Sequence, residues 1–199
     1  MTAEAIRKAY EFGMVQIESE IAALVKLVEE LRPHNMLEIG SEAGGTFYLW
    51  TRILPIGGLK ISLDLPTGTS GSGRFAEPNA LAQRTTRLKS WSANVHVVTG
   101  DSHEQRSWDT VDAILNRGRE KLDFLFLDGD HSYEGVKLDW EDYRKFVRPG
   151  GLVAFHDIVD SEFHRKRGCF VSRLWREIEG EKHAFTAGQE WGGIGVVRV

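Results

Sequence analysis

Apolar residues at helical spacing dominate the first part of the chain. They recur every three or four residues through 3–31, at Ile6, Tyr10, Met14, Ile17, Ile21, Leu24, Val28 and Leu31. One such stripe predicts a single long helix, which Pro33 ends. Gly13 weakens that helix by about 1 kcal/mol relative to alanine. The stripe has two interpretations: the helix covers a sheet or pocket edge, or its heptad-like spacing forms a homodimer seam.

From residue 33 onward, apolar runs alternate with helical patterns. Strands are predicted at 35–39, 59–63, 95–98, 122–127, 151–155 and 193–199, with a weaker one at 184–186. Helices are predicted between them, at 45–54, 77–91, 105–117, 134–147 and 168–179. This alternation predicts an α/β fold with a parallel sheet and right-handed crossovers. Ligands of such sheets bind beyond the carboxyl ends of the strands.

Length and charge restrict the class of protein. With 199 residues the chain fits one domain, and its net charge of −4 argues against binding to a nucleic-acid backbone. Cys169 is the sole cysteine, which excludes an intrachain disulfide and a cysteine-rich zinc site. No secretory signal and no apolar stretch near 18 residues is visible, so the chain is expected to be soluble and cytoplasmic, without a membrane span.

The segment 66–74 is rich in glycine, serine and threonine and follows the second predicted strand. A loop of this kind in a compact domain is often functional. It is either a lid that orders on ligand binding or a passive surface loop.

A glycine turn and a later acid suggest a nucleoside site. Gly40 follows the first strand, and Asp64 follows Gly40 by 24 residues at the end of the second, a spacing that suits bonds to ribose hydroxyls. The third place of a dinucleotide fingerprint holds Glu42, whose charge would repel a pyrophosphate. S-adenosylmethionine carries an ammonium and a sulfonium, so Glu38 and Glu42 favour it over NAD.

Polar residues gather after the later strands. Asp101-Ser102 follows the third strand and either meets an adenine amino group or forms a turn. The densest cluster comprises Asp128-Gly129-Asp130-His131 after the fourth strand and His156-Asp157 after the fifth. Carboxylates from neighbouring strands can share a divalent cation, and a histidine beside them can accept a proton.

These motifs together resemble the class I S-adenosylmethionine-dependent methyltransferases. The resemblance covers residues 33–199, and the motifs that carry it are Leu37–Thr46, Asp64, Gly100-Asp101, Asp123–Tyr133 and Arg148–Gly151. Within that superfamily, Leu127–Gly135 with Phe155-His156-Asp157 resembles the bacterial small-molecule O-methyltransferases of the macrolide-sugar and cephalosporin-hydroxylase-like group. The resemblance implies a Rossmann-like, doubly wound, three-layer α/β/α fold with seven strands, the last antiparallel, preceded by an N-terminal element at 1–32.

The resemblance also implies site residues. Glu38, Gly40, Ser41 and Gly44 would border the methionine part of the cofactor, Asp64 its ribose, and Asp101 and Ser102 its adenine. Asp128 would sit beside the cofactor as first metal ligand, with His156 and Asp157 in place of the Asp-Asn pair of related enzymes. Because imidazole prefers softer cations, the metal is either Mg²⁺ or a transition metal. His131 stands where related enzymes place a lysine base, so His131 and Asp128 are the predicted catalytic residues.

The sequence therefore predicts methyl transfer to an oxygen of a small molecule. The alternative is a nucleoside-binding protein without turnover, and an NAD oxidoreductase is disfavoured by Glu42. The methyl acceptor is not defined by any motif.

Overall fold

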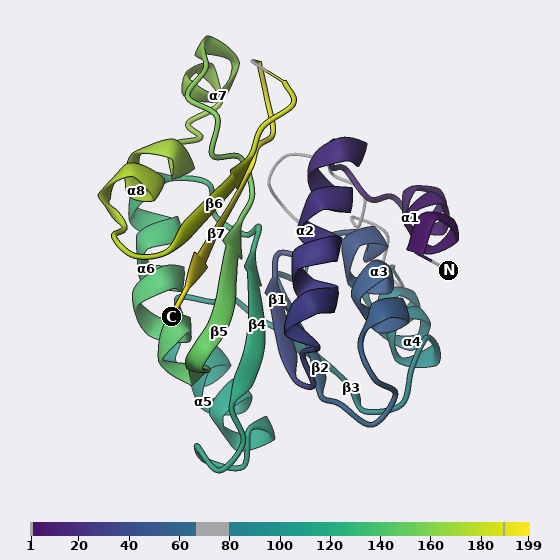
Figure 1. Cartoon of the computed structure of the whole chain (residues 1–199). Helices are drawn as coiled ribbons and strands as arrows, with labels where there is room; N and C mark the ends of the chain where they lie inside the picture. Colours follow the sequence, from purple (N-terminus) through teal and green to yellow (C-terminus); the bar gives the residue numbers. More distant parts are fainter. Residues whose placement is uncertain (1, 67–79, 189) are drawn as a thin grey trace.

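Seven strands form one mixed sheet in the order β3-β2-β1-β4-β5-β7-β6 (Figure 1). The computed structural model describes residues 2–66, 80–188 and 190–199. The strands are β1 (Met36–Ile39), β2 (Lys60–Asp64), β3 (Val95–Thr99), β4 (Leu122–Leu127), β5 (Val147–Phe155), β6 (Lys182–Phe185) and β7 (Ile194–Arg198). β7 is antiparallel to both β5 and β6, and the other pairs are parallel. The predicted fold class, with its antiparallel last strand, is confirmed.

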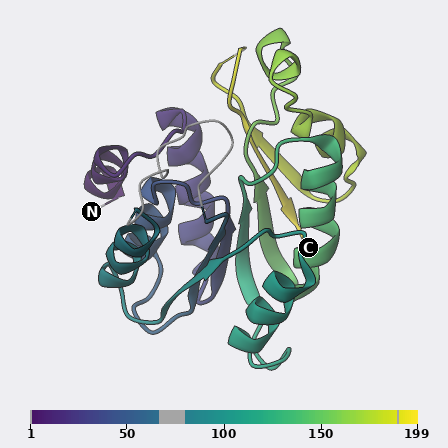
Figure 2. The same cartoon turned by 180° about the vertical axis from the view of Figure 1, so that it is seen from behind.

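Helices cover both faces of the sheet (Figures 1 and 2). One face carries α1 (Thr2–Glu11), α2 (Glu18–Leu31), α3 (Gly45–Ile53) and α4 (Ala80–Ser90), and the other carries α5 (Gln105–Ile114), α6 (Tyr133–Tyr143) and α8 (Val171–Glu177). Alternate side chains of β4 enter the two layers: Phe124 and Phe126 pack with α2 and α3, whereas Leu125 and Leu127 pack with α5 and α6. This two-sided burial explains why the strand is apolar throughout.

The predicted single helix over 3–31 is wrong, because the structure has two helices there. α1 ends at Glu11 and α2 begins at Glu18. Gly13 lies between them with φ +89°, a left-handed conformation that a helix interior does not allow and that glycine adopts readily. The apolar stripe continues across the break, and Ile6, Ile21 and Leu24 are all buried in the same core layer.

Other elements also differ from the prediction. The helix predicted over 134–147 stops at Tyr143, a 3-10 turn (Arg144–Phe146) follows, and Val147 already belongs to β5. β5 shifts register against β4 near Gly150, whose φ is +79°. The short helix α7 (Glu162–Lys166) was not predicted, and it lies beyond the carboxyl ends of the parallel strands (Figure 1). Of the predicted loop 66–74, all but Pro66 lies outside the described residues.

The two terminal regions of the chain meet above the sheet. The carboxylate of Glu20, on α2, is 1% exposed and accepts hydrogen bonds from the backbone N–H groups of Ala187 and Gly193, each at 2.7 Å. A buried carboxylate is stable when such charge-assisted bonds replace water. Glu20 therefore fixes α2 to the segment that enters β7. Within the described part of the chain, no helix is long and apolar enough to cross a membrane.

Candidate active site

A cavity of about 680 Å³ opens beyond the carboxyl ends of β1 to β5. Residues after each strand line it: Gly40 and Glu42, Asp64 and Leu65, Gly100 to His103, Asp128 to His131, and His156 with Asp157. Small-molecule pockets commonly measure about 300–1,000 Å³, so this one has room for a nucleoside-sized ligand. It spans the point where β1 and β4 lie side by side, the switch point at which ligands of this topology bind.

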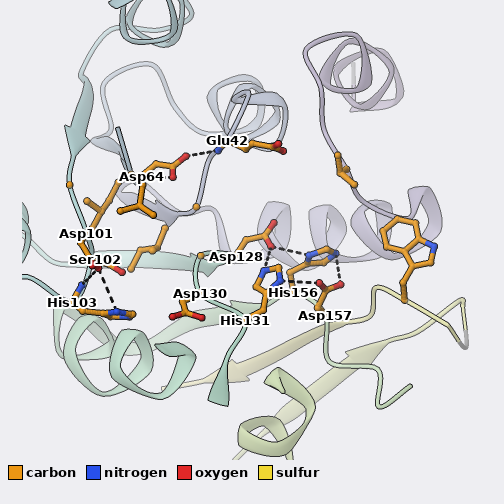
Figure 3. A pocket seen from close by; sticks show the side chains of 18 of the residues that line it. Glu42, Asp64, Asp101, Ser102, His103, Asp128, Asp130, His131, His156 and Asp157 are labelled. Carbon is orange, nitrogen blue, oxygen red and sulfur yellow. Dashed lines mark hydrogen bonds and ion pairs between the residues drawn. The ribbon is translucent and has the colours of Figure 1, made fainter. Parts of the chain in front are cut away.

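The structure brings most of the predicted site residues to this cavity (Figure 3). Its lining includes Gly40, Asp64, Asp101, Ser102, Asp128, His131, His156 and Asp157. Glu38, Ser41 and Gly44 are not among the lining residues. Glu38 is fully buried on β1, and burial followed by the nearby charge of Asp128 raises its pKa well above the ordinary value. The roles of these residues toward a cofactor stay predictions.

Gly40 is required by the close approach of two loops. Its φ is +85°, and a Cβ atom at this position would lie 2.0 Å from the backbone oxygen of Asp128. The turn after β1 therefore packs directly on the turn after β4. This contact sets the distance between the end of the cavity at Asp64 and the polar cluster around Asp128.

Asp64 is held in place from three sides. Its Oδ2 accepts the N–H of Glu42 at 2.6 Å, its Oδ1 accepts the N–H of Leu65 at 2.7 Å, and Arg84 lies 3.0 Å from Oδ2. The Arg84 side chain is only 2% exposed, so the ion pair is buried. A carboxylate has about four acceptor positions. Three of them are occupied, so Asp64 keeps an acceptor position on Oδ1 while its own orientation is fixed.

Two carboxylates and two histidines form a compact cluster at the other end (Figure 3). Oδ1 of Asp128 lies 3.1 Å from Nε2 of His131 and 2.9 Å from Nδ1 of His156. The remaining ring nitrogens face Asp157: Nδ1 of His131 is 3.3 Å from Oδ2, and Nε2 of His156 is 3.5 Å from Oδ1. Each of the four ring nitrogens therefore faces a carboxylate oxygen. The backbone of Asp157 has a left-handed conformation, with φ +62°.

This arrangement favours charged histidines. Burial opposes the imidazolium of His156, but the Asp128 carboxylate outweighs it and raises the pKa of His156 to about 9. Burial also opposes charge on His131, and the hydrogen bond to Asp128 raises its pKa above the usual value. Burial disfavours ionised Asp128 too, yet the two histidines hold its pKa well below the ordinary range. Two imidazolium ions then balance two carboxylates.

The same atoms suit a divalent cation, because one such ion can replace two ring protons without changing the charge of the cluster. Ligand atoms of Asp128, His131 and His156 lie within 4.8 Å of one another. The three predicted ligands Asp128, His156 and Asp157 do not surround one point in the same way. Nδ1 of His156 faces Asp128, whereas Nε2, on the other side of the ring, faces Asp157. Two imidazoles and a carboxylate fit zinc or another transition metal better than Mg²⁺, which prefers oxygen ligands.

Sequence reasoning missed several residues of this site. Gln16, between α1 and α2, donates from Nε2 to Oδ2 of Asp128 at 2.9 Å. His164, on α7, is 3% exposed and places Nε2 3.4 Å from Oδ1 of Asp157. Val15, Phe163 and Trp191 add apolar lining to the cavity. None of these residues stands in a motif, because each reaches the site from a segment outside the strand ends.

Comparison with known proteins gives the family. A family described as "Methyltransferase domain" matches residues 37–158, more than half of the chain. An uncharacterized protein of Acanthamoeba polyphaga mimivirus is 28% identical over 148 residues, covering 74% of this chain and 62% of that protein. A second uncharacterized relative, from Sinorhizobium fredii, is 26% identical over 160 residues, covering 76% of this chain. The chain spans only 16% of that relative's length.

Solved structures share the fold across the whole chain. An O-methyltransferase from Bacillus cereus in complex with S-adenosylhomocysteine superposes with a TM-score of 0.60 at 21% identity, covering 100% of this chain and 90% of that one. An O-methyltransferase from Streptomyces achromogenes, involved in tomaymycin synthesis and in complex with S-adenosylmethionine, gives 0.62 at 21% identity, with 98% and 89% covered. These likenesses establish the Rossmann-like methyltransferase fold. With the family match over residues 37–158, they show that the chain belongs to the methyltransferase-domain family.

Proposed function

We propose that this methyltransferase uses S-adenosylmethionine to methylate a hydroxyl oxygen of a small molecule. One observation carries the proposal: a single cavity joins the fixed carboxylate of Asp64 to the cluster of Asp128, His131, His156 and Asp157. The Asp64 carboxylate suits recognition of a ribose hydroxyl. The cluster of acids and histidines suits removal of a proton from a methyl acceptor. The structural relatives that hold S-adenosylmethionine or S-adenosylhomocysteine support this choice of cofactor.

The nucleoside would lie between the ends of β2, β3 and β4. Asp64 would accept a hydrogen bond from a ribose hydroxyl, Asp101 would accept one from the adenine amino group, and the side chains of Leu63 and Leu65 would form the apolar wall beside them. This orientation directs the methionine part toward Gly40 and Asp128. The carboxylates at that end attract the cofactor's ammonium and sulfonium charges.

S-adenosylmethionine, when bound, supplies a methyl group on a positively charged sulfur. Transfer forms a bond between the acceptor oxygen and the methyl carbon and breaks the carbon–sulfur bond, whose electron pair stays on sulfur. The hydroxyl proton must pass to a base. Holding the two reactants in line is the larger part of such catalysis, and the base completes it.

His131 is our choice for the base. Nδ1 of His131 lies 3.3 Å from Oδ2 of Asp157, an ion-pair contact that helps to hold the ring, and Nε2 is the nitrogen that would exchange a proton. Nε2 faces Asp128 at 3.1 Å, and although burial opposes charge on the ring, the hydrogen bond to this carboxylate raises the pKa of His131 above its usual value. His131 therefore becomes an effective base only when the charge of Asp128 is balanced in another way.

A divalent cation on Asp128 and His156 would give that balance. It would also supply positive charge for an acceptor alkoxide. The histidine content of the cluster makes a transition metal the better candidate than Mg²⁺. This metal requirement is part of the proposal and separate from the family assignment.

The experiment is a screen of hydroxyl-bearing small molecules with methyl-labelled S-adenosylmethionine, run with Zn²⁺, Mn²⁺, Mg²⁺ or a chelator. Label transfer to an acceptor is expected, and His131→Ala should reduce it by about 10²-fold or more, as for loss of a general base. His183→Ala is the matched control, since His183 is exposed on β6. The products should be checked for an O-methyl group by mass spectrometry and NMR.

Thermal-shift measurements with S-adenosylhomocysteine and with NAD accompany the screen. Stabilisation by NAD alone would contradict the proposal. Stabilisation by S-adenosylhomocysteine with no label transfer to any acceptor would favour the nucleoside-binding alternative. Full activity of both His131→Ala and the chelated protein would remove the base and the metal from the mechanism.

A further inference from the structure

A second histidine–carboxylate pair lies at the nucleoside end of the cavity, apart from the cluster around Asp128. Asp139, on α6, is 1% exposed, and its Oδ1 lies 3.3 Å from Nε2 of His103. A carboxylate buried in a helix is costly unless it is paired. The proposed mechanism does not use either residue, although His103 lines the cavity.

His103 makes its remaining contacts with the loop after β3. Its backbone N–H donates to Oδ1 of Asp101 at 2.9 Å, and its Nδ1 lies 3.5 Å from the same oxygen. Nε2 also lies 3.1 Å from the carbonyl oxygen of Gly135 on α6. Both the backbone and the ring of His103 therefore hold Oδ1 of Asp101. In the described part of the chain, Oδ2 of Asp101 takes part in no hydrogen bond.

The helix α6 supports the loops on both sides of this end of the cavity. Tyr143, one turn after Asp139, donates from its hydroxyl to the carbonyl oxygen of Ser102 at 2.8 Å. A Cβ atom on Gly129 would lie 3.3 Å from Oδ2 of Asp139, so this carboxylate also lies directly under the turn after β4. The pair of His103 and Asp139 thus ties one wall of the cavity to the other.

We propose that His103, held by Asp139, is a positioning residue that presents the Asp101 carboxylate to the exocyclic amino group of the cofactor's purine and so selects adenine over a 6-oxo purine. The inference rests on the proposed function, because it takes the nucleoside to bind at this end. A carboxylate is an acceptor only, so Oδ2 of Asp101 accepts from an amino group and repels a carbonyl oxygen. The backbone N–H and the imidazole of His103 at Oδ1 fix the orientation of this carboxylate, which lines the cavity.

The test compares binding of S-adenosylhomocysteine and S-inosylhomocysteine by calorimetry. The wild-type chain should bind the adenine nucleoside at least about tenfold more tightly, the scale of one hydrogen bond to a charged group. His103→Asn and Asp139→Asn should each bring this ratio down severalfold toward one. His103→Gln, which keeps a donor on a longer side chain, should restore part of the ratio. His183→Asn, at the exposed histidine of β6, should leave it unchanged.

The ratio of the two affinities separates a positioning role of His103 from a purely structural one. Loss of a structural contact would weaken the binding of both nucleosides equally and leave the ratio unchanged. Folding of each variant is checked by circular dichroism. His103→Asn and Asp139→Asn remove different partners of the same pair, so if one variant does not fold, the other still provides the test. An unchanged ratio in a folded variant with weakened binding of both nucleosides overturns the inference alone. Failure of the wild-type chain to bind either nucleoside overturns the proposed function and this inference with it.

Discussion

The side-chain amide of Gln16 donates a hydrogen bond to Oδ2 of Asp128 at 2.9 Å, although 112 residues separate the two in the chain. Gln16 is 5% exposed and lies between α1 and α2. Oδ1 of Asp128 is meanwhile shared by His131 and His156. Gln16 therefore fixes which oxygen of Asp128 faces the histidines, the kind of outer support that orients a catalytic or metal-binding carboxylate.

Replacing Gln16 with leucine should affect turnover more than cofactor binding. Gln16→Leu removes the donor to a charged group, worth roughly 1.5–3 kcal/mol, and allows Asp128 to rotate. We expect kcat to fall about tenfold while the Kd for S-adenosylhomocysteine changes by less than about threefold. Gln105→Leu, on the exposed part of α5, is the control. A parallel loss of binding and turnover would instead place Gln16 in contact with the cofactor.

Asp64 should determine cofactor affinity. Asp64→Asn keeps the shape of the side chain beside the buried Arg84 but removes the charge from the bonds to ribose. Calorimetric titration should show S-adenosylhomocysteine binding weakened about tenfold or more, since such bonds contribute roughly 1.5–3 kcal/mol. Asp64→Ala should also lower the stability, because Arg84 loses its carboxylate. Unchanged affinity in Asp64→Asn, with Asp109→Asn as the surface control, would contradict the ribose assignment.

The strands were predictable because burial leaves a local signature. Leu122–Leu127 was predicted with the bounds of β4, since each of its faces packs against a helix layer. The residues after the strands were predictable for a related reason: parallel strands bring their carboxyl ends to one edge. Asp64, Asp128 and Asp157 accordingly meet one cavity.

The remaining parts of the site depend on contacts that leave no local pattern. Gln16 lies in a break between helices whose apolar stripe runs on without interruption, so periodicity alone extended one helix across it. His164 stands on a helix of five residues, too short for a periodic signal. The partners of His103 were also hidden, because Asp139 reads as an ordinary polar position of a helix until its 1% exposure is known.

The pair of His103 and Asp139 should make stability depend on pH. The hydrogen bond to Asp139, opposed by burial, raises the pKa of His103 to about 9 in the folded chain, against about 6.5 in the unfolded chain. A raised folded-state pKa adds stability that is fully present below about pH 6.5 and is lost as the pH rises through about 9. The free energy of unfolding in urea should therefore fall toward the value of His103→Asn across this range. Parallel curves for the two proteins would contradict the shift, and His183→Asn serves as control.

Metal binding should favour transition metals. In equilibrium dialysis, Zn²⁺ or Mn²⁺ should bind at one ion per chain at least tenfold more tightly than Mg²⁺, because the imidazole of His156 is a ligand of the proposed site. His156→Ala should abolish this preference, and His183→Ala should keep it. Binding should tighten from pH 6 to 8, since the ion displaces ring protons. Tight binding of Mg²⁺ alone would show that only the carboxylates act as ligands.

Glu20 should contribute strongly to stability. Glu20→Ala leaves the buried N–H group of Gly193 without its acceptor, at a cost of roughly 1–3 kcal/mol, and removes the part-buried hydrogen bond from Ala187. Urea unfolding should show a loss of about 2 kcal/mol, whereas Glu30→Ala, exposed on the same helix, should change stability by less than about 0.5 kcal/mol. Equal stability of the two variants would mean that water replaces the carboxylate.

The link from Glu20 to Ala187 and Gly193 also has a consequence for synthesis on the ribosome. Its two hydrogen bonds connect Glu20 to residues that follow it by 167 and 173 positions in the chain. The strand β7, which lies between β5 and β6 in the sheet, begins directly after Gly193. The edge of the sheet formed by β1, β2 and β3 has its residues available much earlier in translation. The sheet edge that carries Asp64 and Asp101 can therefore form first, and Trp191 adds its part of the cavity wall only when the end of the chain has been synthesised.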